Sequence, residues 1–208
     1  FRIPWEAERV PGVALVGPVE TPVHPETPVT IDRAGVAYAL VSAKGKAVPA
    51  GGCLAGFRDL EVLDADGRVR FRLADVVDQV LAGAASFAVE QPARLRYTRR
   101  QVGYHDAVKG DLAKPLDSLR DFVIVRSDRT PVFHLANVCD DITQHITHII
   151  RGDDHVENTY RHVFLFAALG APIPHYAHLP MIVNREGKPY SKRDGDAFVG
   201  DFRDKGYL

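Results

Sequence analysis

Cysteine is scarce in this chain, where only Cys53 and Cys139 occur, far apart and without a C-x-x-C pair. That pattern excludes a disulfide framework and a zinc site built from cysteines. Long apolar runs are also missing, and none approaches the length of a membrane-spanning helix. We therefore expect a cytoplasmic protein that makes no membrane contact.

An excess of one charge is lacking as well, because 26 Lys and Arg stand against 27 Asp and Glu, for a formal net charge of -1. A chain with this balance has no global attraction for nucleic acid, so such a contact would need a local basic cluster. One candidate cluster is Arg94, Arg96, Arg99, Arg100 and Lys109. At 208 residues the chain can form one large or two small domains.

The first part of the chain is rich in Val, Pro and Gly. Short alternating pieces predict strands at 13–16 and 36–41. An Asp-Ala-Asp-Gly turn signal predicts a hairpin between residues 60–63 and 69–73. The apolar spacing over 74–82 predicts a short helix, so we expect a β-rich α+β region here.

The second part has a different pattern. Short β-branched runs at 122–125 and 146–150 predict strands that are covered on both faces. Residues 132–140 predict helical turns between them, and the apolar run 179–183 predicts a later strand. Strands that alternate with helices indicate an α/β fold with a parallel sheet.

A well-marked helix is predicted after Gly152. Asp154 and Glu157 have the spacing of a capping box, and an apolar stripe follows over 160–168. Gly170 is typical of the end of such a helix.

Arg151 stands where the strand before this helix ends. Ligands of open α/β sheets bind at that edge, and a guanidinium there can hold a carboxylate with two parallel hydrogen bonds. Position alone favours the alternative, a surface arginine paired with Asp153 or Asp154.

Histidine is concentrated in one segment, because seven of the nine histidines lie between His134 and His178. Together with nearby aspartates they raise the alternative of a metal-dependent phosphohydrolase. His145 and His148 would point to different faces of a strand, and no H-E-x-x-H occurs. We therefore expect structural histidines and no metal site.

Several motifs in the second part follow one another in a fixed order. They are D-F-V-I-V-R-S-D from Asp121, H-L-A-N-V-C-D-D from His134, I-T-H-I-I-R-G-D-D-H-V-E-N-T from Ile146, H-L-P from His178 and P-Y-S-K-R-D-G from Pro189. In this order they resemble the second half of the catalytic domain of a bacterial glutamyl-tRNA synthetase. The resemblance covers roughly residues 94–208 and is strongest from residue 119.

The resemblance implies an α/β fold in two regions. Residues 119–208 would be the second half of a class I synthetase Rossmann-like parallel sheet. Residues 1–118 would be a β-rich α+β connective region, similar to an acceptor-stem-binding region, with an insertion that the resemblance leaves unassigned.

The resemblance also implies two groups of substrate-binding residues. Arg151 would hold the α-carboxylate of glutamate, and Asn137 and Phe133 would line the same pocket. Phe133 stands where a tyrosine is usual, so it supplies a wall and no hydroxyl, and core packing is its other role. Asp154 and His155, at the start of the helix, would bind ATP.

The segment Ser191, Lys192 and Arg193 resembles the mobile K-M-S-K-S loop of class I synthetases. These three residues would then be catalytic. Lys192 would also bind ATP and neutralise the departing pyrophosphate. Pro189 stands where the first lysine of that signature is usual, and Lys188 comes one place earlier.

From these implications we expect a monomeric glutamate-tRNA ligase that uses ATP, Mg²⁺, glutamate and tRNA(Glu). No H-I-G-H-like segment occurs from Phe1 to Leu208, and the chain does not begin with an initiator methionine. We expect a fragment without the H-I-G-H half, which is inactive alone and exposes apolar surface. A synthetase-like protein that binds tRNA without catalysis is the second alternative, beside the phosphohydrolase.

Overall fold

The computed structural model of the chain describes residues 1–23, 29–41, 47–89, 93–183, 187 and 199–206. The strands are β1 (Val13–Pro22), β2 (Val29–Asp32), β3 (Gly35–Val41), β4 (Ala47–Gly52), β5 (Glu61–Leu63), β6 (Val69–Arg72), β7 (Phe87–Val89), β8 (Arg94–Asp106), β9 (Gly110–Pro115), β10 (His148–Gly152) and β11 (His175–Leu179). The α-helices are α1 (Val77–Ala82), α2 (Phe133–Thr143), α3 (Val156–Ala168) and α4 (Val199–Asp204). The 3-10 helices are η1 (Ala7–Arg9), η2 (Leu54–Phe57), η3 (Leu73–Asp75), η4 (Leu116–Ser118) and η5 (Asp153–His155).

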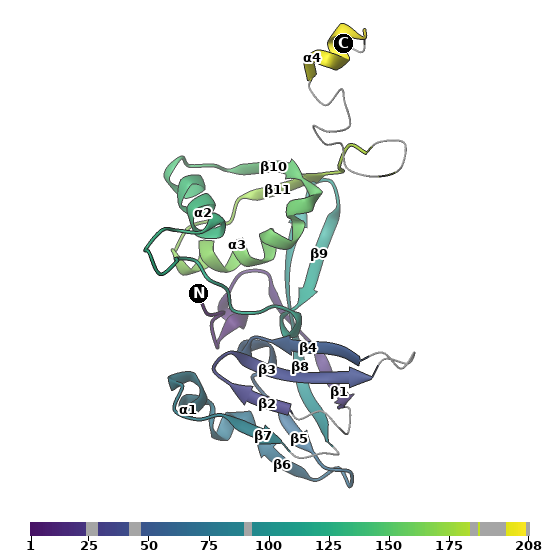
Figure 1. Cartoon of the computed structure of the whole chain (residues 1–208), viewed down its shortest axis with the longest axis vertical. Helices are drawn as coiled ribbons and strands as arrows, with labels where there is room; N and C mark the ends of the chain where they lie inside the picture. Colours follow the sequence, from purple (N-terminus) through teal and green to yellow (C-terminus); the bar gives the residue numbers. More distant parts are fainter. Residues whose placement is uncertain (24–28, 42–46, 90–92, 184–186, 188–198, 207–208) are drawn as a thin grey trace.

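Strand β8 joins the two parts of the molecule (Figure 1). It has 13 residues and pairs in antiparallel fashion with β1, β5 and β9. At its far end, Asp106 pairs in parallel with Tyr176 of β11. β11 in turn pairs in parallel with β10, so the sheet runs β10-β11-β8-β5-β6. The predicted α/β fold is confirmed, and its parallel part is the β10–α3–β11 unit beside the end of β8.

A second sheet, in the order β4-β3-β2-β7, lies in the lower part of Figure 1. The core that packs against it contains Phe57, Leu60, Leu73 and Leu95, all fully buried. The first three precede α1 in the sequence, and Leu95 follows it. Each such side chain stabilises the fold by about 1.5–3 kcal/mol through its burial.

Another core connects the two predicted regions. Val102 and Leu116 pack in one buried cluster with Tyr160 and Phe164 of α3. Apolar contact therefore continues across residue 118, and the division between 1–118 and 119–208 stays a prediction.

Gly52, at the end of β4, allows two backbone segments to approach closely. A Cβ atom at this position would lie 2.1 Å from the carbonyl oxygen of Asp117 in η4. The next residue, Cys53, donates its amide to the carbonyl of Leu119 over 2.8 Å. A side chain at position 52 would push η4 away from β4, so the contact requires glycine.

Several local predictions are confirmed. The hairpin forms between β5 and β6, with Val62 opposite Phe71. The helix predicted over 74–82 is present as η3 followed by α1, and the predictions over 132–140 and after Gly152 correspond to α2 and α3. The last predicted strand was misplaced, because the paired segment is β11 and not residues 179–183.

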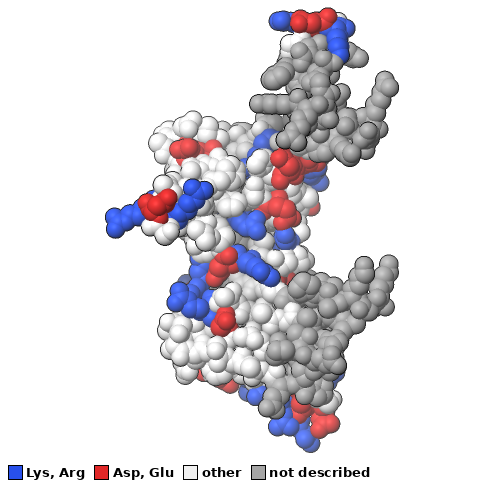
Figure 2. All heavy atoms as spheres, viewed as in Figure 1, with Lys and Arg blue, Asp and Glu red and all other residues white. Residues whose placement is uncertain are grey.

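The predicted basic cluster is largely neutralised by neighbouring carboxylates. Arg96 lies 2.5 Å from Glu61, and Arg99 lies 3.2 Å from Asp117. On the face drawn in Figure 2, blue and red spheres of the described residues lie side by side. The remaining members pair in the same way, Arg94 with Glu20, Arg100 with Asp59 and Lys109 with Asp153.

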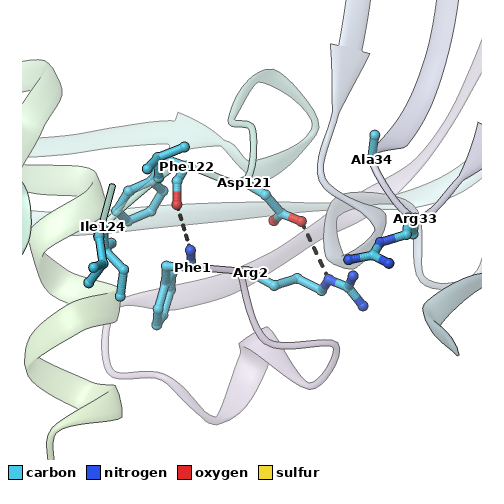
Figure 3. Close-up of a pocket in the computed structure, with 9 residues that line it drawn as sticks. Phe1, Arg2, Arg33, Ala34, Asp121, Phe122 and Ile124 are labelled. Carbon is cyan, nitrogen blue, oxygen red and sulfur yellow. Dashed lines mark hydrogen bonds and ion pairs between the residues drawn. The ribbon is translucent and has the colours of Figure 1, made fainter. Parts of the chain in front are cut away.

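The strand predicted at residues 122–125 was wrong, because backbone groups of this segment form hydrogen bonds with Phe1 and Val132 and not with a neighbouring strand. The amide of Phe122 donates to the carbonyl of Phe1 over 3.0 Å, and the amino nitrogen of Phe1 donates back over 2.6 Å (Figure 3). Val132 donates to the carbonyl of Ile124 over 2.9 Å. A backbone that is satisfied by such distant partners needs no sheet neighbour. Val123 is 65% exposed and lines the hollow drawn in Figure 3.

One face of β10 and β11 lies open. Ile150 is 67% exposed and Leu179 is 47% exposed, and both point away from the side that carries Tyr176 and His178. This agrees with the expectation of exposed apolar surface, but the prediction that the strand at 146–150 is covered on both faces was wrong. Within the described ranges, no helix is long and apolar enough to cross a bilayer.

Candidate functional site

Arg151 lies one residue before the end of β10, at the carboxyl edge of the parallel strands. Its Nε donates to His178 Nε2 over 3.1 Å, and its Nη2 donates to Thr159 Oγ1 over 2.6 Å. A longer contact of 3.4 Å joins Nη2 to the carbonyl of His155. The guanidinium is therefore held between β11 and the first turns of α3.

Arg151 has no ion-pair partner among the described residues. Asp153 pairs with Lys109 at 2.9 Å, and Asp154 lies 3.7 Å from His155. The alternative of a surface arginine paired with Asp153 or Asp154 is therefore wrong. Burial lowers the pKa of Arg151, which marks the cost of holding this cation away from water. A half-buried cation without a counter-ion is the environment expected where an anion binds.

Beside Arg151 lies a fully buried pair, Asp106 and His178, neither of which is exposed. Nδ1 of His178 lies 2.6 Å from Oδ2 of Asp106, and the His178 amide donates to the same carboxylate. The amides of Val108 and Lys109 also donate to it. Burial alone would raise the pKa of Asp106, but these hydrogen bonds outweigh it and lower the pKa to about 2.

Phe133 lies at the start of α2, and its role as a wall of the glutamate pocket stays a prediction. It is 50% exposed, so the expectation that it packs in the core was wrong. Its ring centre lies 5.7 Å from that of His155 and 5.9 Å from that of His162. It thus packs on one side against two imidazole rings, and its other side is open to solvent.

His162 is the buried one of these two rings. It is fully buried on α3, and its Nε2 lies 3.2 Å from Nδ1 of His134. Burial is the main cause that lowers the pKa of His162 to about 3, and the positive charge of Arg151 adds to it. His162 is therefore neutral at neutral pH.

Asn137 and Asp141 follow Phe133 at intervals of four residues on α2, so the three side chains share one helix face. Asn137 is partly buried, and its role in substrate binding stays a prediction. Oδ2 of Asp141 is buried without a hydrogen-bond partner among the described residues, and so is the hydroxyl of Tyr176. Burial raises the pKa of Asp141, although the charge of Arg151 opposes this shift. The sequence had raised Asp141 only as one of the aspartates near the histidines, and it had not singled out Tyr176.

The capping box predicted at the start of α3 does not form. The N-cap position is His155, and no side chain caps the helix there. Glu157, the second residue of the predicted box, pairs with Lys114. Asp153, another carboxylate in the same turn, pairs with Lys109. Asp154 and His155 lie in the preceding turn η5, where Asp154 is exposed and His155 is partly exposed.

Ser191, Lys192 and Arg193 lie outside the described residues. Their catalytic role and the ATP contact of Lys192 therefore remain expectations from the sequence.

Several of the described histidines lie in pairs with one other residue. The rings of His148 and His175 lie 5.0 Å apart, His134 pairs with His162, and His178 pairs with Asp106. In the described parts of the chain, no three His, Cys, Asp or Glu side chains are grouped as metal ligands.

Asp106 and Thr159 were missed as site residues. An aspartate before a turn is an ordinary turn former, and Asp106 does accept two amides of the turn after β8. No local signal connects it to His178, which is 72 residues away. Thr159 closes the motif that begins at Ile146, and its spacing of eight residues from Arg151 could have indicated their contact.

Residues 85–208 match the family model described as tRNA synthetases class I (E and Q), catalytic domain. A glutamate-tRNA ligase of Desulfitobacterium hafniense is 49% identical over 109 residues, which are 52% of this chain and 22% of that protein. A glutamate-tRNA ligase of Methylacidiphilum infernorum is 39% identical over 131 residues, which are 63% of this chain and 30% of that protein. The chain thus spans less than a third of the length of these relatives.

The solved glutamate-tRNA synthetase of Elizabethkingia anophelis is 29% identical, with a TM-score of 0.44. The similarity covers 66% of this chain and 28% of that one.

Proposed function

Because the chain belongs to the class I tRNA synthetases (E and Q), we propose that it forms part of a glutamate-tRNA ligase. Such an enzyme activates glutamate with ATP to glutamyl-adenylate and transfers the glutamyl group to tRNA(Glu). The glutamate specificity rests on relatives that are themselves glutamate-tRNA ligases.

The observation that carries this proposal is the state of Arg151. Its guanidinium is half-buried at the carboxyl edge of β10 and β11, without a carboxylate partner in the described residues. The contacts of Nε and Nη2 leave Nη1 without a partner among the described residues, so this end is available for a ligand. A carboxylate of the substrate matches that end in charge and in planar geometry.

The chain's own residues act mainly by positioning and by electrostatics. Arg151 would hold the α-carboxylate of glutamate, with Phe133 as a wall and Asn137 one helical turn further along α2. A carboxylate oxygen then attacks the α-phosphate of ATP, and the bond to the departing pyrophosphate breaks. Lys192 in the S-K-R segment would neutralise the charge on pyrophosphate as that bond breaks.

Transfer completes the reaction. A hydroxyl of the terminal ribose of tRNA attacks the carbonyl carbon of the adenylate and loses its proton, and AMP leaves with the bridging oxygen. The tRNA partner, a cytoplasmic location and a monomeric state are parts of the same proposal.

The start of α3 fits a nucleotide in its chemistry. Asp154 and His155 present exposed polar groups there, while Lys109 and Lys114 neutralise the carboxylates of Asp153 and Glu157. A phosphate or ribose would thus lie near backbone amides and near carboxylates that already have lysine partners, and not near a row of unpaired carboxylates. The described residues group no three metal ligands, so Mg²⁺ would be held largely by the phosphates of ATP, whose negative charge it neutralises.

The test is glutamate-dependent exchange of pyrophosphate into ATP, in the presence of tRNA(Glu) and Mg²⁺, by the protein that contains this chain. The proposal predicts exchange with glutamate and much less with glutamine or aspartate. Binding of tRNA without exchange would favour the non-catalytic alternative. Exchange that depends on glutamine and not on glutamate would contradict the specificity.

A further inference from the structure

We propose that Asp106 and His178 are positioning residues, which hold the Arg151 guanidinium in one orientation by presenting a hydrogen-bond acceptor to its Nε. This inference rests on the proposed function for its kinetic consequences, but its structural claim can be tested separately. Neither residue is needed to touch the substrate.

The ring of His178 has a defined orientation. It stacks on Tyr176 with centroids 5.9 Å apart and an interplanar angle of 8°, and Tyr104 lies 6.1 Å away at an angle of 57°. Nδ1 is directed at Asp106 over 2.6 Å. Two aromatic neighbours and the buried carboxylate on Nδ1 together restrict the orientation of the ring.

The contacts also determine which nitrogen of His178 carries the proton. Nε of Arg151 can only donate, so Nε2 of His178 must accept across the 3.1 Å between them. Nδ1 then carries the proton and donates it to Asp106, which is ionised because its pKa lies at about 2. The buried carboxylate thus selects the tautomer in which Nε2 is an acceptor for Arg151.

Thr159 completes the arrangement. Its Oγ1 accepts from Nη2 of Arg151 over 2.6 Å and lies 3.2 Å from Nε2 of His178. His178 and Thr159 together fill the edge of the guanidinium formed by Nε and Nη2. A carboxylate ligand is therefore directed to the other edge, which carries Nη1. If the inner contacts were lost, the guanidinium could rotate and present either edge.

Two substitutions of His178 separate its two contacts. His178→Gln places an amide oxygen near the position of Nε2, so it keeps an acceptor for Arg151 and loses the contact to Asp106. His178→Asn places an amide nitrogen near the position of Nδ1, so it keeps the contact to Asp106 and loses the acceptor. The pair is closely matched in polarity, and both leave Asp106 its backbone donors.

The positioning role predicts that His178→Asn raises the glutamate KM about ten- to hundredfold, because a hydrogen bond to a charged group is lost. The glutamate KM of His178→Gln should stay within about threefold of that of the original enzyme. The glutamine oxygen replaces Nε2 as the acceptor and does not depend on a ring tautomer. The ATP KM should change little in either variant. A purely structural role predicts similar losses in both variants, and that result would overturn the proposal.

Asp106→Asn tests the tautomer. An amide nitrogen facing Nδ1 would donate to it, so the ring proton would move to Nε2, where it opposes the N–H of Arg151. Long-range ¹H–¹⁵N NMR of the 208-residue chain should show the Nδ1–H tautomer of His178 originally and the Nε2–H tautomer in Asp106→Asn. The signal of Arg151 Nε–H should shift in Asp106→Asn and in His178→Asn, and shift least in His178→Gln.

The exchange assay and the NMR measurement test the proposed function and the positioning role separately. If the protein shows no glutamate-dependent exchange but the NMR pattern holds, the positioning role stands and the proposed function fails. If exchange is present but His178 has the Nε2–H tautomer in the unsubstituted protein, the positioning role is wrong and the proposed function stands. An Arg151 Nε–H signal that is the same in all variants would also overturn the positioning role.

Discussion

The Cζ atom of Arg151 lies 5.6 Å from the centre of the Tyr176 ring. The cation that has no carboxylate partner in the described residues thus has an aromatic face beside it. Such a contact stabilises a partly desolvated guanidinium by about 0.5–2 kcal/mol. It leaves the N–H groups of Nη1 available, which an ion pair within the protein would not.

The buried His162 should make the stability of the fold depend on pH. Burial lowers its pKa to about 3 in the folded protein, from an ordinary value of 6.5. Between these values the unfolded chain binds a proton that the folded chain does not, so stability is complete above about pH 6.5 and falls as the pH decreases. The slope from this residue is about 1.4 kcal/mol per pH unit.

Urea denaturation at several pH values between 4 and 7 measures this slope. His162→Leu should remove that part of it, whereas Val163→Ala, a neighbouring core change, should lower stability equally at every pH. The same slope in His162→Leu as in the original chain would show that His162 is not the group that titrates.

The close approach at Gly52 gives a second prediction. Gly52→Ala should destabilise the fold by about 1–3 kcal/mol, because the new methyl group would lie 2.1 Å from the Asp117 carbonyl. Gly17→Ala is the matched control, since a Cβ there meets no heavy atom within 4 Å. Thermal melting of both variants makes the comparison, and equal melting temperatures would mean that β4 and η4 do not pack as described.

Lys192 provides a prediction that comes from the sequence resemblance. Its charge should matter mainly as pyrophosphate departs, so Lys192→Ala should lower kcat for adenylate formation by about a hundredfold. The glutamate KM should stay nearly the same. Pyrophosphate exchange with tRNA present is the assay, and an effect confined to the glutamate KM would contradict the assigned role.

The elements with strong local signals could be predicted from the sequence. Helix α3 and strand β10 were found because an apolar stripe and a β-branched run are encoded within a few residues of each other. The same reasoning placed Arg151 at the edge of the sheet, since the end of β10 is itself a local feature.

The errors arose where distant contacts decide the structure. Residues 122–125 have the composition of a strand, but Phe1 and the turn before α2 take up their backbone groups. Phe133 was expected in the core because it is a large apolar residue, but it is 50% exposed, and its local sequence does not show which neighbours cover it. Asp106 and His178 meet only through the parallel pairing of β8 with β11, which no local pattern encodes.

The measurement that tests the central claim most directly is the glutamate dependence of pyrophosphate exchange in Arg151→Ala, in the protein that contains this chain. Loss of a charge-assisted contact should lower kcat/KM for glutamate by about 3 kcal/mol, or roughly a hundredfold, while the ATP KM changes little. Arg70→Ala, which removes an exposed arginine of β6 that pairs with Asp64, is the control and should leave both values unchanged. If glutamate kinetics in Arg151→Ala equal those of the control, Arg151 is not the substrate-binding cation.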